Sequence, residues 1–133
     1  MQRIIAIARR LRTDEDGYAA SAIIAPVIFL LLFTALQGAL WYQGTNVAQN
    51  AAVAAYNDAR AYESTTGAGQ ASARQVLDQA GGFLQDSNVS VNRSADTVTV
   101  DVTGQVVSMI PGVQLPAVHR TITGPVERWV PAP

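Results

Sequence analysis

The chain has 133 residues, a formal net charge of −1 and no cysteine. Its length allows roughly one domain of ordinary size, and the lack of cysteine excludes disulfides, thiolate zinc sites and cysteine nucleophiles. The near-neutral charge gives no reason to expect contact with nucleic acid. The charged residues are, however, distributed very unevenly along the chain, and this distribution predicts where the protein resides.

Residues 1–17 form a basic segment at the N-terminus. It contains the arginines Arg3, Arg9, Arg10 and Arg12, followed by the acidic triplet Asp14–Asp16. By the positive-inside rule, the arginines and the terminal amine predict that this end lies in the cytoplasm. We therefore interpret residues 1–17 as a cytoplasmic leader. A secretory signal peptide is a competing interpretation, but the long apolar core and the acidic triplet argue against it.

A long uncharged segment follows the leader. No charged residue occurs between Gly17 and Asn57, and residues 23–33 are apolar on every face of a helix. Such a helix must be surrounded by lipid or protein, and the rest of the chain is too small to enclose it. Spanning a bilayer takes about 20 residues, and Trp41 and Tyr42 lie where a distal aromatic belt is expected. We predict a transmembrane helix over residues 18–42, with the C-terminal part outside the cytoplasm.

The helix is predicted to continue beyond the membrane over residues 43–66, where alanine is frequent and proline is absent. Small residues recur there at helical spacing, and small residues let helix backbones approach closely. The helix-packing residues expected from this pattern are Gly38, Ala48, Ala51, Ala52 and Ala55. Thr65, Thr66 and residues 67–69 are expected to end the helix.

Residues 70–133 are predicted to form a small exported head. Residues 71–85 have the periodicity of a second helix, and residues 89–102 then alternate strictly between apolar and polar side chains. This alternation predicts an antiparallel hairpin with a turn over residues 93–96. Residues 118–123 suggest a third strand, and residues 125–133 a short edge strand or an extended arm. A helix on a small antiparallel sheet is the simplest packing, which places the chain in the α+β class.

The sequence shows no constellation of catalytic residues. His119 is the only histidine, and no second histidine or cysteine accompanies it to form a metal site. Asp96 and Asp101 flank the predicted hairpin, where aspartates are common in turns and on solvent-exposed faces. Asp58 and Glu63 could bind a cation only with ligands from elsewhere in the chain. We therefore expect no enzymatic activity, no cofactor and no metal.

The uncharged segment carries a family resemblance. Asp16-Gly17, followed by residues 22–27 and a leucine run, resembles the TadE-like pseudopilins of tight-adherence (Flp, type IVc) pilus systems. The likeness continues through residues 49–52 and 59–61 to the valine-threonine hairpin and residues 124–128. The resemblance implies a structural minor pilin that contributes to assembly or to the tip of a type IV-like pilus. The implied partners are other pilins and pseudopilins, a prepilin peptidase, the pilus membrane platform and the lipid bilayer.

In type IV-like pilins the prepilin peptidase cuts after a glycine at the cytoplasmic edge of the membrane. Carried over to this chain, the resemblance implies cleavage between Gly17 and Tyr18. Such pilins usually have glutamate as the fifth residue of the mature chain, whereas this chain has Ala22, or Ala20 when counted back from Pro26. Without this carboxylate, the chain avoids the free-energy cost of placing an unpaired charge in lipid. It also lacks a group that could set the alignment of neighbouring subunits.

Three interpretations of this departure stay open at the level of sequence. Assembly tolerates Ala22, or the subunit occupies a filament tip, or the chain is never cleaved and remains an anchor. The alternative from another functional class is a bitopic membrane protein whose exported head binds an envelope partner without any filament.

Overall fold

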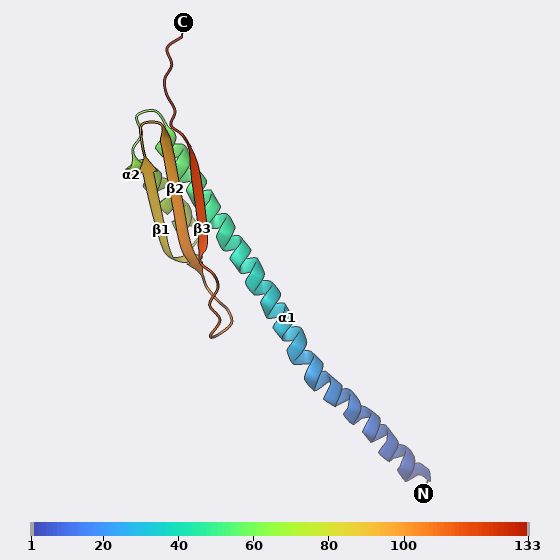
Figure 1. Ribbon diagram of the computed structural model, residues 1–133. Helices are drawn as coiled ribbons and strands as arrows, with labels where there is room; N and C mark the ends of the chain where they lie inside the picture. Colours follow the sequence, from blue (N-terminus) through green and yellow to red (C-terminus); the bar gives the residue numbers. More distant parts are fainter. Residues whose placement is uncertain (1, 133) are drawn as a thin grey trace. The chain divides into compact units, whose positions relative to one another are not determined.

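A computed structural model of the chain describes the backbone of residues 2–132 and the side chains of residues 17–132. In chain order it contains helices α1 (Gln2–Arg60) and α2 (Thr66–Gln79) and strands β1 (Leu84–Arg93), β2 (Thr97–Val106) and β3 (Val118–Pro125) (Figure 1). The predicted α+β class is confirmed. The chain divides into two compact units, Met1–Leu36 and Gln37–Pro133, and α1 contributes to both.

In the first unit, the apolar segment of α1 is not buried by any of the side chains that the structure describes. Residues 17–36 are all exposed, and Ile23 keeps 70% of its surface accessible. The serine and the threonine of this segment bond within the helix, because Ser21 Oγ donates to the Gly17 carbonyl at 2.9 Å and Thr34 Oγ1 donates to the Leu30 carbonyl at 2.8 Å. The helix thus pairs these two hydroxyl groups internally and presents a mostly apolar surface to its surroundings.

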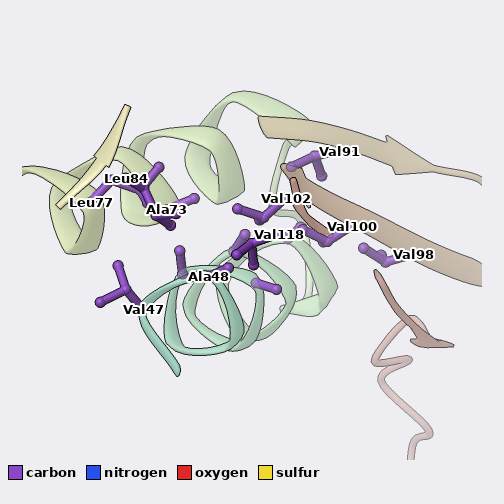
Figure 2. Packing of buried hydrophobic residues seen from close by; sticks show 14 of the residues in the cluster. Val47, Ala48, Ala73, Leu77, Leu84, Val91, Val98, Val100, Val102 and Val118 are labelled. Atoms are coloured by element: carbon purple, nitrogen blue, oxygen red, sulfur yellow. The ribbon is translucent and has the colours of Figure 1, made fainter. Parts of the chain in front are cut away.

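In the second unit, α1 turns a face of small residues toward the sheet. Fully or nearly fully buried residues recur there every three or four positions: Val47, Ala48, Ala51, Ala52, Ala55 and Ala59. They pack against the valines of β2 and β3, and Figure 2 shows side chains from α1, α2 and the strands meeting in one cluster. Because alanine is short, the helix backbone can lie close to the sheet. This contact forms the core of the head.

The three strands form an antiparallel sheet in the order β1-β2-β3. The inner face of β2 consists of Val98, Val100, Val102, Gly104 and Val106, all buried, and the register sets Val100 opposite both Val91 and Ile122. The predicted hairpin and third strand are therefore confirmed. A bulge interrupts β1 between Gln85 and Asn88, where Asp86 adopts a positive φ of 47°. The alternation in β2 has the period expected of a strand with one buried face.

Helix α2 begins earlier than predicted and ends before the predicted boundary. Thr65 caps it, since Thr65 Oγ1 accepts a hydrogen bond from Ala68 N at 3.2 Å. This threonine was expected to end the preceding helix, which instead ends at Arg60. A Ser or Thr before a helix satisfies one of its first free N–H groups, which explains the start at Thr66. Residues 66–69, expected to be a break, are the first turn of α2.

The predicted end of the second helix at Gln85 is also wrong. Gly81 and Gly82 have positive φ values of 68° and 74°, a conformation that glycine adopts without steric cost. The chain therefore leaves the helix after Gln79, and Leu84 becomes the first residue of β1. Beyond β3, residues 126–132 adopt neither helix nor strand, so the segment is an extended arm rather than an edge strand.

Candidate functional site

The apolar segment of α1 is long enough to cross a membrane once, and it is the single candidate span among the described residues. Its predicted processing site, Gly17 and Tyr18, lies within α1. Tyr18 keeps 83% of its surface exposed, and a Cβ added at Gly17 would have nothing within 4 Å. Ala22 is exposed on the same helix. Nothing described in the chain covers the bond between Gly17 and Tyr18. The predicted leader precedes the region whose side chains are described, and Met1 lies outside the described residues.

The predicted helix-packing residues do not form one exposed surface. Ala48, Ala51, Ala52 and Ala55 are each 0% exposed, because α1 uses them to pack against its own head. The expectation that these alanines contact other pilins is therefore corrected. Only Gly38 remains exposed, with nothing within 4 Å of an added Cβ. Small residues do permit close packing here, but the partner is the chain's own sheet.

The opposite side of α1 carries a stripe of uncharged residues, four of them with amide side chains, that sequence analysis missed. Residues spaced by three or four positions line it: Gln43, Asn46, Asn50, Val53 and Asn57. Asn46 is half-buried and the other four are exposed. The repeated i, i+3, i+4 and i+7 spacing of amide side chains was the available signal. We call these five residues the amide stripe.

Gln37, the first residue of the second unit, binds the segment that follows β2. This residue is 5% exposed, and its side-chain Nε2 donates to the Val107 carbonyl at 3.3 Å while its Oε1 accepts from Met109 N at 2.7 Å. A second bond runs from Trp41 Nε1 to the Pro116 carbonyl at 3.1 Å. These two side chains hold the segment between β2 and β3, residues 107–117, against the helix. We call this segment the β2–β3 loop.

The C-terminal end of α1 contacts the start of the arm. Glu127 N donates to the Arg60 carbonyl at 2.9 Å, the Arg60 guanidinium pairs with the Glu127 carboxylate at 2.7 Å, and Tyr56 OH donates to the Pro125 carbonyl at 3.3 Å. Arg60 also lies over the Tyr56 ring, 5.4 Å from its centroid. The hydrogen bond with Tyr56 and the nearby Glu127 carboxylate raise the pKa of Arg60. The guanidinium therefore stays charged and keeps both contacts at any physiological pH.

A side chain from β1 donates hydrogen bonds to backbone carbonyls at the C-terminal end of α1. Arg93 of β1 reaches the helix end and donates through Nη1 to the Ala59 carbonyl at 2.9 Å and also to the Ser64 carbonyl. The last carbonyls of a helix lack partners within the helix, and a positive charge is favourable beside them. Arg93 therefore links the first hairpin to the point where the chain leaves α1.

The outer face of the sheet holds the side chains that sequence analysis examined for chemistry. Asp101 Oδ1 accepts from Thr121 Oγ1 at 2.5 Å and lies 3.3 Å from His119 Nε2, which is itself 3.2 Å from Thr121 Oγ1. In a nucleophile–histidine–carboxylate relay the imidazole bridges hydroxyl and carboxylate through two different nitrogens. Here one nitrogen faces both groups and the threonine donates directly to the carboxylate. This arrangement does not activate the hydroxyl.

The other acidic candidates are also placed by the fold. Asp58 accepts a hydrogen bond from Ser72 of α2, and Asp96 forms an ion pair with Arg128 of the arm. Glu63 lies in the connection between the helices with a positive φ of 58°. Among the described residues, no three histidine or acidic side chains gather closely enough to hold a metal ion.

The similarity of this chain to known proteins lies within helix α1. The family model of TadE-like protein matches residues 21–55. This match confirms the TadE-like resemblance over the apolar segment, the buried alanine face and most of the amide stripe. It ends at residue 55, so the likeness of residues 59–61, of the valine-threonine hairpin and of residues 124–128 to TadE-like proteins stays a prediction. No curated protein and no solved structure matches the chain.

Proposed function

We propose that this chain is a structural, non-enzymatic minor pilin of a tight-adherence pilus. The TadE-like match suggests association with this type of pilus. The exposed apolar segment suggests single-pass anchoring in the cell membrane. In the proposed arrangement the leader is cytoplasmic, the head is extracytoplasmic, and the chain joins the filament or its tip. Its partners are other pilins and the pilus membrane platform.

The uncharged exposed side of α1 is the observation that carries this proposal. Between Gly17 and Asn57 the helix has no charged residue, although four of the five residues of the amide stripe are exposed. A helix face that remains in water normally carries charged side chains. Amide side chains can instead hydrogen-bond across a helix–helix contact in a medium of low polarity, where a charge would be costly. The face therefore suits contact with helices of neighbouring subunits.

The amide stripe also offers an answer to the missing glutamate at position 22. A buried asparagine between helices can fix their register, because a shift leaves its amide without a partner. Asn46, Asn50 and Asn57 could supply such registration without a carboxylate in lipid. Cleavage by a prepilin peptidase between Gly17 and Tyr18 is part of the proposal, since both residues are exposed.

Site-directed photo-crosslinking tests this role, and the chain has no native cysteine to interfere. A benzophenone maleimide attached at Asn50→Cys should give adducts that contain another pilin. The matched control is Gln75→Cys, which is also an exposed amide on a helix but lies on α2. Equal adduct yields at both positions, or adducts without pilin at Asn50→Cys, would contradict the proposal.

The bitopic envelope protein is the second candidate, and one observation favours it. Because Ala48, Ala51, Ala52 and Ala55 are buried in the head, the stripe of small residues is not available to neighbouring helices. Under this alternative the chain would be absent from sheared pilus fractions while remaining in the membrane. A pilus fraction containing the chain would exclude it.

A further inference from the structure

The β2–β3 loop is an exposed segment of unusual composition. No charged residue occurs between Asp101 and Arg120. Within the loop, Val107, Met109 and Val113 expose 48%, 51% and 44% of their surfaces, respectively. The loop is attached to α1 through Gln37 and Trp41, as described above. An exposed apolar segment held at a fixed place marks an interaction site.

The place of attachment determines what surrounds the loop. Gln37 follows Leu36, the last residue of the exposed apolar segment, and Trp41 lies in the predicted distal aromatic belt. Tryptophan is enriched where a membrane helix meets the headgroups. In the proposed membrane arrangement, these contacts with Gln37 and Trp41 put the loop at the level where the helix emerges from the bilayer. An amide at this level is costly unless paired, and the loop backbone pairs with both polar atoms of Gln37.

The loop also pairs several of its polar groups internally. Ser108 Oγ donates to the Ile110 carbonyl at 3.0 Å and accepts from Ile110 N at 3.3 Å, and Val113 N donates to the Ile110 carbonyl at 3.2 Å. These bonds close a turn at Pro111 and Gly112, where Gly112 has a positive φ of 78°. Several polar groups of the tip are therefore satisfied internally, which reduces the cost of contact with lipid.

We propose that the β2–β3 loop inserts its tip, residues 109–113, into the outer interface of the bilayer as a second membrane contact beside the transmembrane helix. The occupant of this surface is lipid, at the boundary between headgroups and acyl chains. Asp86 lines a hollow together with Val113 and Leu115, and its carboxylate stays among the headgroups and limits the depth of the tip. The contact holds the head close to the membrane until the subunit leaves it. This inference rests on the proposed membrane insertion of α1.

Fluorescence quenching in lipid bilayers tests the loop and the anchor separately. The full chain is reconstituted in vesicles with a single cysteine labelled by an environment-sensitive dye, and spin-labelled lipids serve as quenchers. The loop position is Val113→Cys. Ala95→Cys is the water-exposed control, because the turn between β1 and β2 lies at the other end of β2. Phe29→Cys, in the exposed apolar segment, reports membrane insertion of α1.

We expect dye at position 113 to be quenched several-fold more than dye at position 95, at a depth of about 5–10 Å into the boundary between headgroups and acyl chains. Met109→Asp, introduced into the labelled chain, should abolish this difference because a charge at the tip opposes its contact with lipid. Quenching at position 29 but not at position 113 would overturn the loop contact alone. A blue-shifted but unquenched dye at position 113 would mean that protein covers the loop, and this too overturns it. Absence of quenching at position 29 would overturn the proposed function as well.

Discussion

Gly69 of α2 lies directly against the backbone of Ala55 in α1. A Cβ at position 69 would approach the Ala55 carbonyl oxygen to 2.7 Å and the Ala59 Cβ to 2.9 Å. Both distances are shorter than ordinary van der Waals contact, and the carbonyl oxygen belongs to a rigid helix. The two helices can therefore meet at this distance only because residue 69 has no side chain.

We expect Gly69→Ala to destabilise the head by about 1–3 kcal/mol, because the helices must separate to admit the methyl group. Gly67→Ala is the matched control in the same turn of α2, since an added Cβ there meets only Thr65 Oγ1 at 3.7 Å. Alanine favours a helix over glycine, so this control should be neutral or stabilising by about 0.5–1 kcal/mol. Urea unfolding of the full chain in detergent measures both. Equal stability of the two variants would contradict the close approach.

Ala51→Leu should also destabilise the head, by about 1–3 kcal/mol, because Ala51 is fully buried between α1 and the sheet. Val53→Leu adds bulk on the exposed side of the same helix and should change stability by no more than about 0.5 kcal/mol. Far-UV circular dichroism during urea titration follows the unfolding. If Ala51→Leu weakened pilin association without any loss of stability, the alanine face would be an intermolecular contact after all.

Arg93→Met should loosen the junction between the first hairpin and the end of α1. The change keeps most of the aliphatic stem but removes the charged donor to the Ala59 and Ser64 carbonyls. Loss of hydrogen bonds from a charged group costs about 1.5–3 kcal/mol. Arg120→Met, at an exposed position of β3, serves as the control and should have a small effect. Hydrogen exchange of residues 58–64 should accelerate in Arg93→Met and not in the control.

Gly17→Val should block removal of the leader, because a branched side chain would crowd the peptidase subsite beside the cut bond. The wild-type mature chain should begin at Tyr18, and N-terminal sequencing of membrane or sheared-pilus fractions checks this. The variant should run larger on a gel. Ala19→Val, an equivalent enlargement on the other side of Tyr18, should still be cleaved. Detection of an intact Met1 in the wild-type chain would contradict the processing step and would indicate a permanently anchored protein.

The sequence alone was sufficient to predict the exposed apolar helix, the α+β class and the TadE-like resemblance. These features depend on local patterns: residues 23–33 are apolar at every helical position, and Val98, Val100 and Val102 alternate with polar side chains. The period of a pattern identifies helix or strand without knowledge of the partner. The hairpin register follows in turn, since a shift by one residue would expose all of these valines.

The ends of the helices needed tertiary information. Residues 65–69 read as a break because threonine and glycine weaken a helix interior. In the structure Thr65 caps α2, and Gly69 is kept inside the helix because α1 packs too closely for any side chain. The cost of a helical glycine is offset by a contact between residues distant in sequence, and no local pattern reveals that contact.

The role of the alanine face was decided only by the tertiary structure. The spacing of Ala48, Ala51 and Ala55 predicts that something packs closely against α1, and this is what the fold shows. Spacing carries no information on whether that partner is another chain or the sheet of the same chain. The sheet occupies the face because its valines and the small residues of α1 bury each other within one chain. The amide stripe, on the side left uncovered, then becomes the surface available to a neighbouring subunit.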